Sequence, residues 1–409
     1  MKFSRRRFLA GTALGTGAFA LNSAVAFAQE GPQNIAGFDK TQTEVDRTSV
    51  WQPFSDRKIR MGLVGYGLCQ FSAAFELQNH PNVEIVGVSD LISDRCEALA
   101  KRVKCEKKFE SLEKMVLDDT IEAIFVATDA PAHARHCIEA MKHGKHVASA
   151  VPAVFGSERG LEEADELLET VKKTGLVYML FETSAYHDAV YASREIYKAG
   201  GFGKMIYTEG EYYHYGVEQL DSYKGWRIGL PPQYYPTHSN AYYVNVTGGS
   251  FTEVSCMGHT SPNFKSFQPE NNVYRNPFGS EIALFRTSEG GMARMAVCWD
   301  MPEMHGEQGR NSGEKGSFWN GSFAAATPDV AELVKKLNLK KPALPPGVAA
   351  GGHGGSHGYL GNEFVEAILQ NRRPLVDVIS ALNLTVSGIV AHQSALKGGE
   401  LMKIPQFVF

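Results

Sequence analysis

The sequence contains little cysteine, and its cysteines form no recognisable motif. The chain of 409 residues has six cysteines, none of them in a C-x-x-C pair and most of them in apolar segments. A protein that folds in a reducing compartment does not need to pair such thiols. We therefore predict buried thiols rather than a disulfide framework.

A run of basic residues is also absent from the body of the chain. Residues 1–28 carry four basic residues and no acidic one, and the remainder has 37 Lys and Arg against 45 Asp and Glu, a formal net charge of −8. Nucleic acids and anionic membranes attract basic surfaces. The mildly acidic remainder therefore argues against both as partners. The length suits two domains, and a hydrophobic content of 43% allows a packed core.

The N-terminus lacks an apolar run long enough to span a membrane. Residues 4–9 (Ser-Arg-Arg-Arg-Phe-Leu) have the twin-arginine export pattern, residues 10–25 are weakly apolar, and residues 26–28 (Ala-Phe-Ala) form a small-x-small cleavage site. A membrane anchor is the alternative, but a span needs about 20 apolar residues. We predict a twin-arginine signal peptide over 1–28, export of the folded protein to the periplasm, and an extended arm over 29–57.

Residues 58–90 have the layout of a dinucleotide-binding unit. An apolar run at 59–64 ends in Gly65-Tyr66-Gly67, a helical segment follows, and a second apolar run ends at Asp90. Gly65 allows a tight turn, Gly67 lets the backbone approach a pyrophosphate, and Asp90 can accept hydrogen bonds from ribose hydroxyls. The negative charge of Asp90 disfavours a 2′-phosphate, so NAD is predicted over NADP. The third glycine of the fingerprint is Gln70, and an ordinary strand–helix turn is the alternative.

Strands and helices alternate from residue 58 to residue 182. The pattern predicts further strands at 121–128, 146–149 and 177–181, and helices at 93–103, 133–143 and 158–174. Such alternation is typical of a parallel, doubly wound sheet. We predict an α/β protein whose first domain, over 58–182, is an NAD-binding Rossmann domain.

The pattern changes after residue 184. Tyr- and Val-rich runs at 205–214, 251–257, 281–287 and 291–299 predict a large, mostly antiparallel sheet. Segments 303–316 and 345–358 read as glycine-rich loops, and 188–199, 362–371 and 378–397 as helices. We predict a second α/β domain over 183–409 that binds substrate and mediates oligomerisation.

This order of elements resembles the Gfo/Idh/MocA oxidoreductase family over nearly all of the chain after residue 58. The supporting residues are the Gly65–Gly67 turn and segments 128–133, 144–147 and 313–316. The resemblance implies bound NAD and a homo-oligomer. It also implies a set of cofactor-binding residues: Gly65, Tyr66, Gly67, Leu68, Cys69, Asp90, Thr128, His133, Pro152 and Glu182.

Two departures from that family are informative. Most members carry Glu-Lys-Pro where this chain has Ala150-Val151-Pro152, and their Asp-x-Gly-x-His-x-x-Asp stretch is replaced here by residues 234–241. Segments 235–238 (Tyr-Pro-Thr-His) and 351–355 (Gly-Gly-His-Gly-Gly) resemble glycoside hydrolase family 109. That branch uses NAD to oxidise a sugar transiently, eliminate its substituent, add water and return the hydride. Its members place a glutamate before Val-Pro, where this chain has Ala150.

The candidate catalytic residues are His238, Tyr235 and Tyr186. His238, read as part of a loop, could accept the sugar hydroxyl proton or polarise the ketone, because the imidazole pKa lies near working pH. The tyrosines match family tyrosines near the sugar, and ordinary packing is their alternative. Glu182 could order the nicotinamide ribose, act as a base, or form a plain ion pair.

The candidate substrate residues are Trp226, Arg227, Asn240 and His353. Trp and Arg suit sugar stacking and hydroxyl recognition, and they also pack strand edges. His353 and His357 have the spacing of metal ligands on a helix, but the glycines between them argue against a helix, so no metal is predicted.

These patterns predict a periplasmic, NAD-dependent oxidoreductase that acts on a sugar or polyol and holds its cofactor tightly, since nothing outside the cytoplasm obviously supplies NAD. A redox-neutral, NAD-dependent glycosidase is one alternative. A non-catalytic sugar or NAD sensor is another, because both charged groups of the Glu-Lys-Pro motif are missing. The predicted partners are a carbohydrate substrate, the twin-arginine export machinery and further copies of the chain, with no nucleic acid.

Overall fold

The computed structural model describes residues 48–156, 159–302 and 306–409. The predicted signal peptide and most of the predicted arm lie outside these residues. The last part of the arm, residues 48–57, has no helix or strand. It is attached by hydrogen bonds from the Asn82 side chain to the carbonyls of Ser55 (2.5 Å) and Arg57 (2.9 Å).

The first sheet is parallel and has six strands in the order β3-β2-β1-β4-β5-β6. Its strands are β1 (Ile59–Val64), β2 (Val83–Ser89), β3 (Lys108–Phe109), β4 (Ala123–Val126), β5 (His146–Ser149) and β6 (Tyr178–Leu180). The main connecting helices are α2 (Ser93–Val103), α4 (His133–Lys142) and α5 (Gly160–Thr174), with a shorter α1 (Phe71–Ala74) and α3 (Leu112–Met115). This confirms the predicted doubly wound sheet, whose strand order reverses beside β1.

The second sheet has eight strands in the order β13-β12-β11-β7-β10-β9-β8-β14. They are β7 (Met205–Tyr213), β8 (Phe251–Thr260), β9 (Phe278–Thr287), β10 (Met292–Cys298), β11 (Glu307–Gly313), β12 (Gly316–Trp319), β13 (Ser322–Ala325) and β14 (Met402–Lys403). Only the β7–β10 pair is parallel among the described strand pairs of this sheet. The predicted mostly antiparallel sheet is therefore confirmed.

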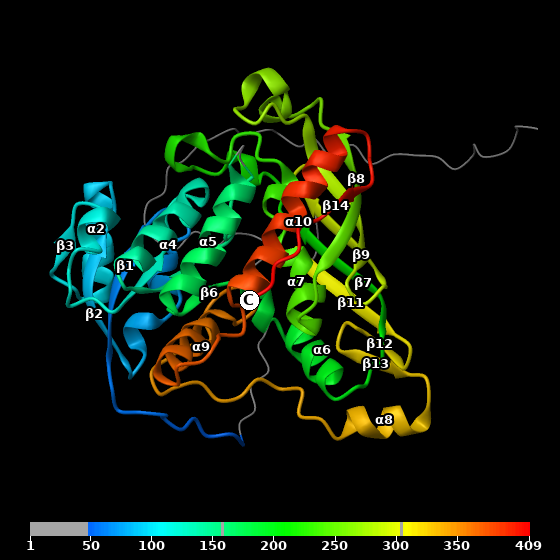
Figure 1. The fold of residues 1–409 in the computed structure, drawn as a ribbon, viewed down its shortest axis with the longest axis horizontal. Helices are drawn as coiled ribbons and strands as arrows, with labels where there is room; N and C mark the ends of the chain where they lie inside the picture. The colour runs from blue at the N-terminus through cyan, green and yellow to red at the C-terminus, as the bar shows by residue number, and fades with distance from the viewer. Residues whose placement is uncertain (1–47, 157–158, 303–305) are drawn as a thin grey trace, which may run out of the picture. The chain divides into compact units, whose positions relative to one another are not determined.

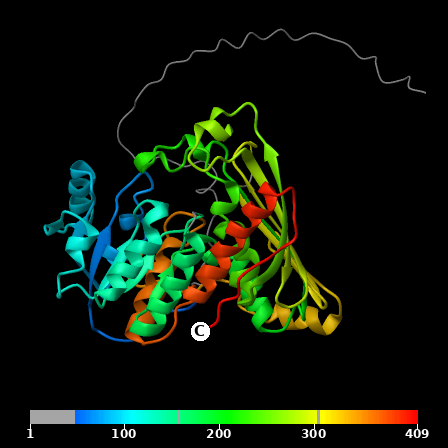
Figure 2. The same cartoon turned by 45° about the horizontal axis from the view of Figure 1, so that its top comes forward.

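Helices cover one face of this second sheet (Figure 1). They are α6 (Asp188–Lys198), α7 (Thr237–Thr247) and α10 (Val378–Leu396). Figure 2 shows the sheet nearly edge-on, with α10 between it and the helices of the first sheet. Large apolar side chains remain exposed on the sheet, among them Met257, Ile282, Leu284, Met292 and Trp319.

The C-terminal half contributes to the core of the first sheet. Helix α9 (His357–Leu369) buries Leu360, Phe364 and Val365 in one cluster with residues of β1, β4 and β6. Ring contacts from Phe181 to Phe364 (6.0 Å) and from Phe75 to His357 (4.4 Å) join the two halves. The glycine-rich segment that precedes α9 is therefore held close to the nucleotide-binding turn.

Two predictions about secondary structure are wrong. Segment 303–316 was predicted as a loop, but residues 307–313 form β11 because they pair with β7 and Asn311 donates to the carbonyl of Tyr242 (2.8 Å). Segment 237–247 is helix α7, in which every residue from Thr237 to Val246 is buried. A helix buried all round has no polar face, so its sequence shows no helical periodicity. Helix α8 (Pro328–Lys335) was not predicted either.

All six cysteines are free; five of them are buried as predicted, and Cys69 is partly exposed. Within the described residues, no helix combines the length and apolarity that crossing a membrane requires.

Candidate functional site

The turn after β1 is built for close approach to a ligand. Gly65 has φ +92°, and a Cβ there would lie 2.2 Å from the Ala127 carbonyl oxygen, so only glycine fits. A Cβ on Gly67 would meet no described heavy atom within 4 Å, and its site faces open space. The Ser72 hydroxyl donates to the Gly65 carbonyl (2.5 Å) and fixes the turn.

Asp90 lies directly after β2, at the same edge of the sheet. Its Oδ2 accepts from the Tyr66 backbone N–H (2.6 Å) and its Oδ1 accepts from the Ile92 N–H (2.8 Å). Each carboxylate oxygen has a second lone pair. The carboxylate is therefore held in place by the backbone and can still accept hydrogen bonds from a ribose diol.

A pocket of about 330 Å³, here called the nucleotide pocket, opens over this edge. Both halves of the chain line it: the first supplies the turn, Asp90, Thr128 and His133, and the second supplies segment 221–227 and Tyr235. An ion pair between Arg95 and Asp221 (3.3 Å) connects the halves at its rim. A glycine turn with open space, a fixed carboxylate and a cationic side chain, Arg227, fit a dinucleotide.

A smaller pocket of about 30 Å³, here called the inner pocket, adjoins the nucleotide pocket. The two share the lining residues Cys69, Phe71, Ala150, Val151, Arg227 and Tyr235. The inner pocket adds three histidines, His214, His238 and His353, and no Asp or Glu is among its described lining residues. Substrate chemistry therefore has histidines and phenols available there, but no carboxylate in direct contact.

His238 lies in the first turn of α7, not in the loop that the sequence predicted. Its Nδ1 is 2.8 Å from Glu182 Oε1 and 3.7 Å from Glu307 Oε1, and all three side chains are at most 4% exposed. The Ser184 backbone N–H donates to Glu182 Oε1 (2.9 Å), and the Ser184 hydroxyl donates to Glu307 Oε2 (2.6 Å). A buried imidazole is thus paired with two carboxylates.

These carboxylates decide the charge of His238. Burial by itself would lower the pKa of this imidazole, but Glu182 and Glu307 outweigh burial and raise its pKa to about 9. The same pairing lowers the pKa of Glu182 against the opposing effect of burial. His238 therefore carries a proton at neutral pH. An imidazolium can donate a hydrogen bond and stabilise negative charge, but it has no lone pair, so this charge state favours the predicted polarisation of the ketone over acceptance of the hydroxyl proton. The catalytic role of His238 stays a prediction.

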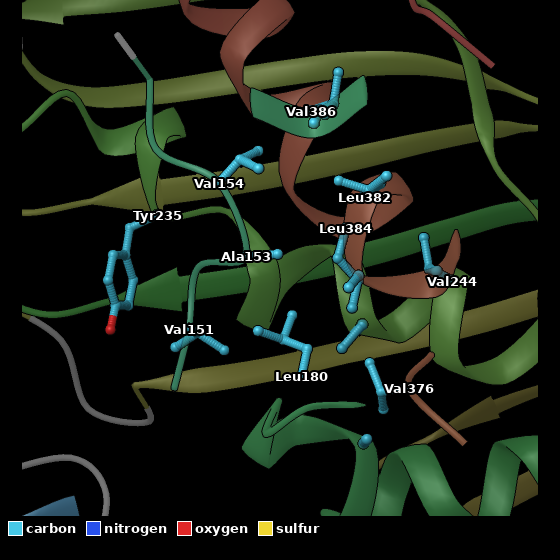
Figure 3. Close-up of a cluster of buried hydrophobic side chains, with 14 of the residues drawn as sticks. Val151, Ala153, Val154, Leu180, Tyr235, Val244, Val376, Leu382, Leu384 and Val386 are labelled. Carbon is cyan, nitrogen blue, oxygen red and sulfur yellow. The ribbon is translucent and has the colours of Figure 1, made fainter. Parts of the chain in front are cut away.

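Tyr235 lines both pockets and is 8% exposed. Figure 3 shows its ring at the edge of a buried aliphatic cluster, with the hydroxyl directed away from Leu382 and Val244. Burial raises the pKa of this phenol, so it remains a neutral hydrogen-bond donor. Tyr235 is therefore placed where the sequence predicted a catalytic tyrosine.

The structure brings most of the other candidates to the pockets. The nucleotide pocket is lined by Gly65, Gly67, Leu68, Cys69, Asp90, Thr128, His133, Trp226 and Arg227, and the inner pocket by His353. Buried His133 contacts the carbonyls of Pro152 (2.9 Å) and Thr128 (3.0 Å), so it holds two wall segments together. Pro152 and Tyr66 act through backbone atoms beside the pocket and do not line it.

Three candidates are placed differently from their predicted roles. The Tyr186 ring stacks on Tyr359 (5.5 Å) outside the described lining of both pockets. The Asn240 side chain donates to the Leu384 carbonyl (2.8 Å) and to Ser387 (3.0 Å), because its side of α7 packs against α10. Glu182 pairs with His238 and lines neither pocket. Tyr186, Asn240 and Glu182 therefore lie outside the described lining of both pockets, and their catalytic, substrate-binding and ribose-binding roles stay predictions.

Sequence reasoning missed Glu307, His214, His187 and Ser184. Glu307 Oε2 lies 3.2 Å from His187 Nδ1, and the same side chain lies beside His238. Glu307 is the first residue of β11, a strand that the sequence did not reveal because it lacks an apolar pattern. His214 directly follows β7. Its position as a polar residue at the end of a strand was the one sequence signal that could have marked it as a functional residue. No group of three or more His, Cys, Asp or Glu suited to a metal occurs in the described ranges.

Comparisons with known proteins agree with this geometry. Residues 59–182 match the Gfo/Idh/MocA family described as "Oxidoreductase family, NAD-binding Rossmann fold". Over most of its length the chain is similar to proteins named glycosyl hydrolase family 109 protein. It is 25% identical to one from Streptomyces filamentosus, covering 98% of this chain and 88% of that protein. It is 24% identical to one from Solibacter usitatus, covering 85% and 88%.

Solved structures share the fold at low sequence identity. A levoglucosan dehydrogenase in complex with NADH and levoglucosan superposes with a TM-score of 0.68 at 18% identity, covering 86% of this chain and 100% of that one. Scyllo-inositol dehydrogenase from Lactobacillus casei, with bound NAD(H) and scyllo-inositol, gives a TM-score of 0.63 at 16% identity, covering 85% and 99%.

Proposed function

We propose, from the membership of residues 59–182 in the Gfo/Idh/MocA oxidoreductase family, that this chain oxidises or reduces a carbohydrate by NAD-dependent hydride transfer. The observation that carries the proposal is the inner pocket, where a buried imidazolium and a neutral phenol adjoin the nucleotide pocket. NAD, when bound, supplies the hydride acceptor or donor. The residues that would hold it are the Gly65–Gly67 turn, Asp90 and Arg227.

The His238 imidazolium supplies electrostatic stabilisation. When a hydride leaves an alcohol carbon, negative charge grows on the oxygen, and a fixed cation in a pocket of low dielectric stabilises that charge. Tyr235, a neutral phenol on the wall shared by the two pockets, can donate a hydrogen bond to the same oxygen or to a neighbouring hydroxyl. Trp226 and Arg227 stack on each other (4.3 Å) and give the wall an apolar face with a cationic edge, which suits a polyhydroxylated ring.

A redox-neutral glycosidase is the second candidate, because the relatives that match over most of the chain carry that name. Most glycosidases use a pair of carboxyl groups, but NAD-dependent glycosidases are an exception to that rule. The argument therefore depends on one position: Ala150 lines the wall where the resemblance implies a glutamate. The missing glutamate favours net redox chemistry over elimination.

The export pattern of residues 1–28 supports a periplasmic enzyme whose cofactor is loaded before export. Both halves of the chain line the nucleotide pocket, and the Arg95–Asp221 ion pair connects the halves at its rim. This arrangement favours slow release of the cofactor. The apolar side chains exposed on the second sheet favour pairing with another copy of the chain, which light scattering of the purified protein would test.

The experiment that tests this function uses the mature protein purified from a periplasmic fraction. Denaturation should release NAD or NADH, and the intact protein should change absorbance near 340 nm in stoichiometric amount when the matching sugar or polyol is added. Aryl glycosides in the same panel test the second candidate, which predicts aglycone release without net NADH. A protein that contains no nucleotide and responds to no sugar contradicts both candidates.

A further inference from the structure

The helix after the glycine turn is too short to neutralise a pyrophosphate by itself. A dinucleotide pyrophosphate ordinarily lies at a helix N-terminus, where aligned peptide dipoles and N–H groups attract it. Here that helix, α1, has only four residues and ends before Glu76, whose φ of +61° cannot continue a helix. The Tyr66 N–H already donates to Asp90 (2.6 Å), and the Gln70 N–H donates to the Gly67 carbonyl (3.0 Å). The turn therefore offers space for a pyrophosphate but little positive charge.

The first half of the chain adds no unpaired cation to the nucleotide pocket. The pocket lining already holds the carboxylates of Asp90, Glu113, Asp129 and Asp221. Arg95 pairs with Asp221 (3.3 Å) and Arg135 pairs with Glu113 (3.7 Å). His133 and His136 also line the pocket, but burial lowers the pKa of both, so they are neutral. A bound pyrophosphate therefore needs positive charge from elsewhere.

Lys224 and Arg227, from the second half of the chain, are the remaining cations of this lining. Neither forms an ion pair with a carboxylate within the part of the chain that the structure describes. Burial raises the pKa of the Cys69 thiol, and the charge of Arg227 partly opposes that rise, which places the guanidinium near the glycine turn. The two unpaired cations thus face the space that the turn leaves open.

The backbone of segment 221–227, here called the clamp segment, is held in an unusual conformation. Lys224 has φ +53°, a left-handed conformation that is costly for a residue with a Cβ, and Gly225 follows with φ +68°. The Gly225 N–H donates to the Ser222 carbonyl (2.9 Å), and the Trp226 ring packs edge-on against Phe155 of the first half (5.9 Å). Strained residues of this kind persist where surrounding contacts hold them, and they concentrate at ligand clamps.

We propose that the clamp segment closes over the cofactor, with Lys224 and Arg227 as the cationic ligands of its pyrophosphate. This inference rests on the proposed function only through bound NAD, and it involves no step of hydride transfer. The Arg95–Asp221 pair and the Trp226–Phe155 contact attach the clamp segment to the first half of the chain. Charge neutralisation and closure are therefore performed by one segment, which gives slow cofactor release a physical cause.

Release of NADH from the holoprotein tests the clamp without turnover. NADH fluorescence is followed after excess NAD is added as the competitor. Lys224→Met should release NADH about 10–100-fold faster, because it removes a hydrogen bond to a charged group. Lys224→Arg keeps the charge and should release NADH at a rate close to that of the wild type. The matched control is Lys104→Met, since Lys104 is also exposed and left-handed (φ +57°) but lines neither pocket.

Salt gives a second readout of the same contact. Added NaCl screens the attraction between a cation and a phosphate. It should therefore speed release from the wild type more steeply than from Lys224→Met. Equal release rates in Lys224→Met and Lys224→Arg would show that the charge of Lys224 does not hold the cofactor, and would overturn the inference.

Displacement of bound NADH by shortened ligands locates the contact on the cofactor. Adenosine lacks a pyrophosphate, so the concentration that displaces half of the NADH should be about 10–100-fold lower in Lys224→Met than in the wild type. ADP-ribose contains the pyrophosphate and should lose affinity together with NADH, so its displacing concentration should not change. An unchanged adenosine value, or an ADP-ribose value that falls as the adenosine value does, would overturn the inference.

The outcomes separate this inference from the proposed function. A wild type that oxidises a sugar, while Lys224→Met releases NADH no faster, overturns the clamp and leaves the proposed function standing. A wild type that binds NADH as described but oxidises no sugar contradicts the proposed function alone. A wild type that binds no NADH overturns both.

Discussion

His238 and His353 both line the inner pocket, but the groups that contact the two rings differ in charge. Behind His238 are two buried carboxylates, Glu182 and Glu307, which keep the ring charged. Behind His353 are a neutral histidine and a peptide carbonyl, which keep the ring neutral and fix its tautomer. The same side chain thus becomes a cation in one place and a neutral imidazole in the other. The partners of a histidine, rather than its presence in a motif, determine the chemistry that it can perform.

The largest effect should come from breaking the carboxylate support of His238. Glu182→Gln leaves a buried imidazolium with only the more distant Glu307, and removing one partner of a buried ion pair typically costs about 3–5 kcal/mol. Urea unfolding of the apoprotein measures this. The control is Glu169→Gln, which breaks a pair with Lys172 (3.4 Å) on the exposed side of α5 and should cost at most about 1 kcal/mol. Equal effects of the two substitutions would show that the His238 pair is not a buried ionic one.

The pH dependence of stability should separate the two histidines. Because the folded pKa of His238 is raised to about 9, its contribution is complete below the unfolded pKa of about 6.5 and is lost as pH rises through 9. The loss should reach up to about 3 kcal/mol. His353 has a lowered folded pKa, so its contribution has the opposite sign: the unfolded state gains a proton, and stability falls, as pH drops below about 6.5.

Urea midpoints of the apoprotein measured across this pH range test both slopes. In Glu182→Gln the loss of stability at alkaline pH should become smaller. The loss of stability at acid pH, to which His353 and other buried neutral histidines contribute, should remain. If Glu182→Gln leaves the fall in stability at alkaline pH unchanged, that fall is caused by a group other than His238.

A smaller effect should follow from loosening the support of His353. Lys341→Met removes a buried amine that donates to the carbonyls of Gly354 (3.4 Å) and Gly355 (3.3 Å) and pairs with Asp188 (2.8 Å). We expect the free energy of unfolding to fall by about 1–3 kcal/mol, because Asp188 is 32% exposed and can be solvated. The His353 tautomer should become mixed in nitrogen-15 spectra, while the His238 resonances should not move. Lys336→Met, an exposed lysine after α8, is the matched control. An unchanged His353 spectrum in Lys341→Met would show that residues 351–355, in which His353 has φ +49°, keep their conformation without the lysine.

Much of the cofactor site could be predicted from the sequence, because its signals are local. The Gly65–Gly67 turn, the apolar strands and the terminal Asp90 follow one another within a short stretch, and each has a single physical reason to be there. The substrate side was less predictable. Tyr235 and His353 lie beside the pockets, whereas the Asn240 side chain contacts α10 and the Tyr186 ring stacks on Tyr359.

By itself, the sequence determined the two-sheet α/β architecture and the nucleotide-binding edge, since hydrophobic periodicity and glycine turns act between neighbours in the chain. Only the tertiary structure decided that β11 brings Glu307 beside His238, and that α9 brings His357 between Ala74 and His353. Those contacts join residues far apart in the sequence, and they set the charge and tautomer of each histidine. The physical reason is that a pKa depends on burial and on nearby charges, which exist only once the chain has folded.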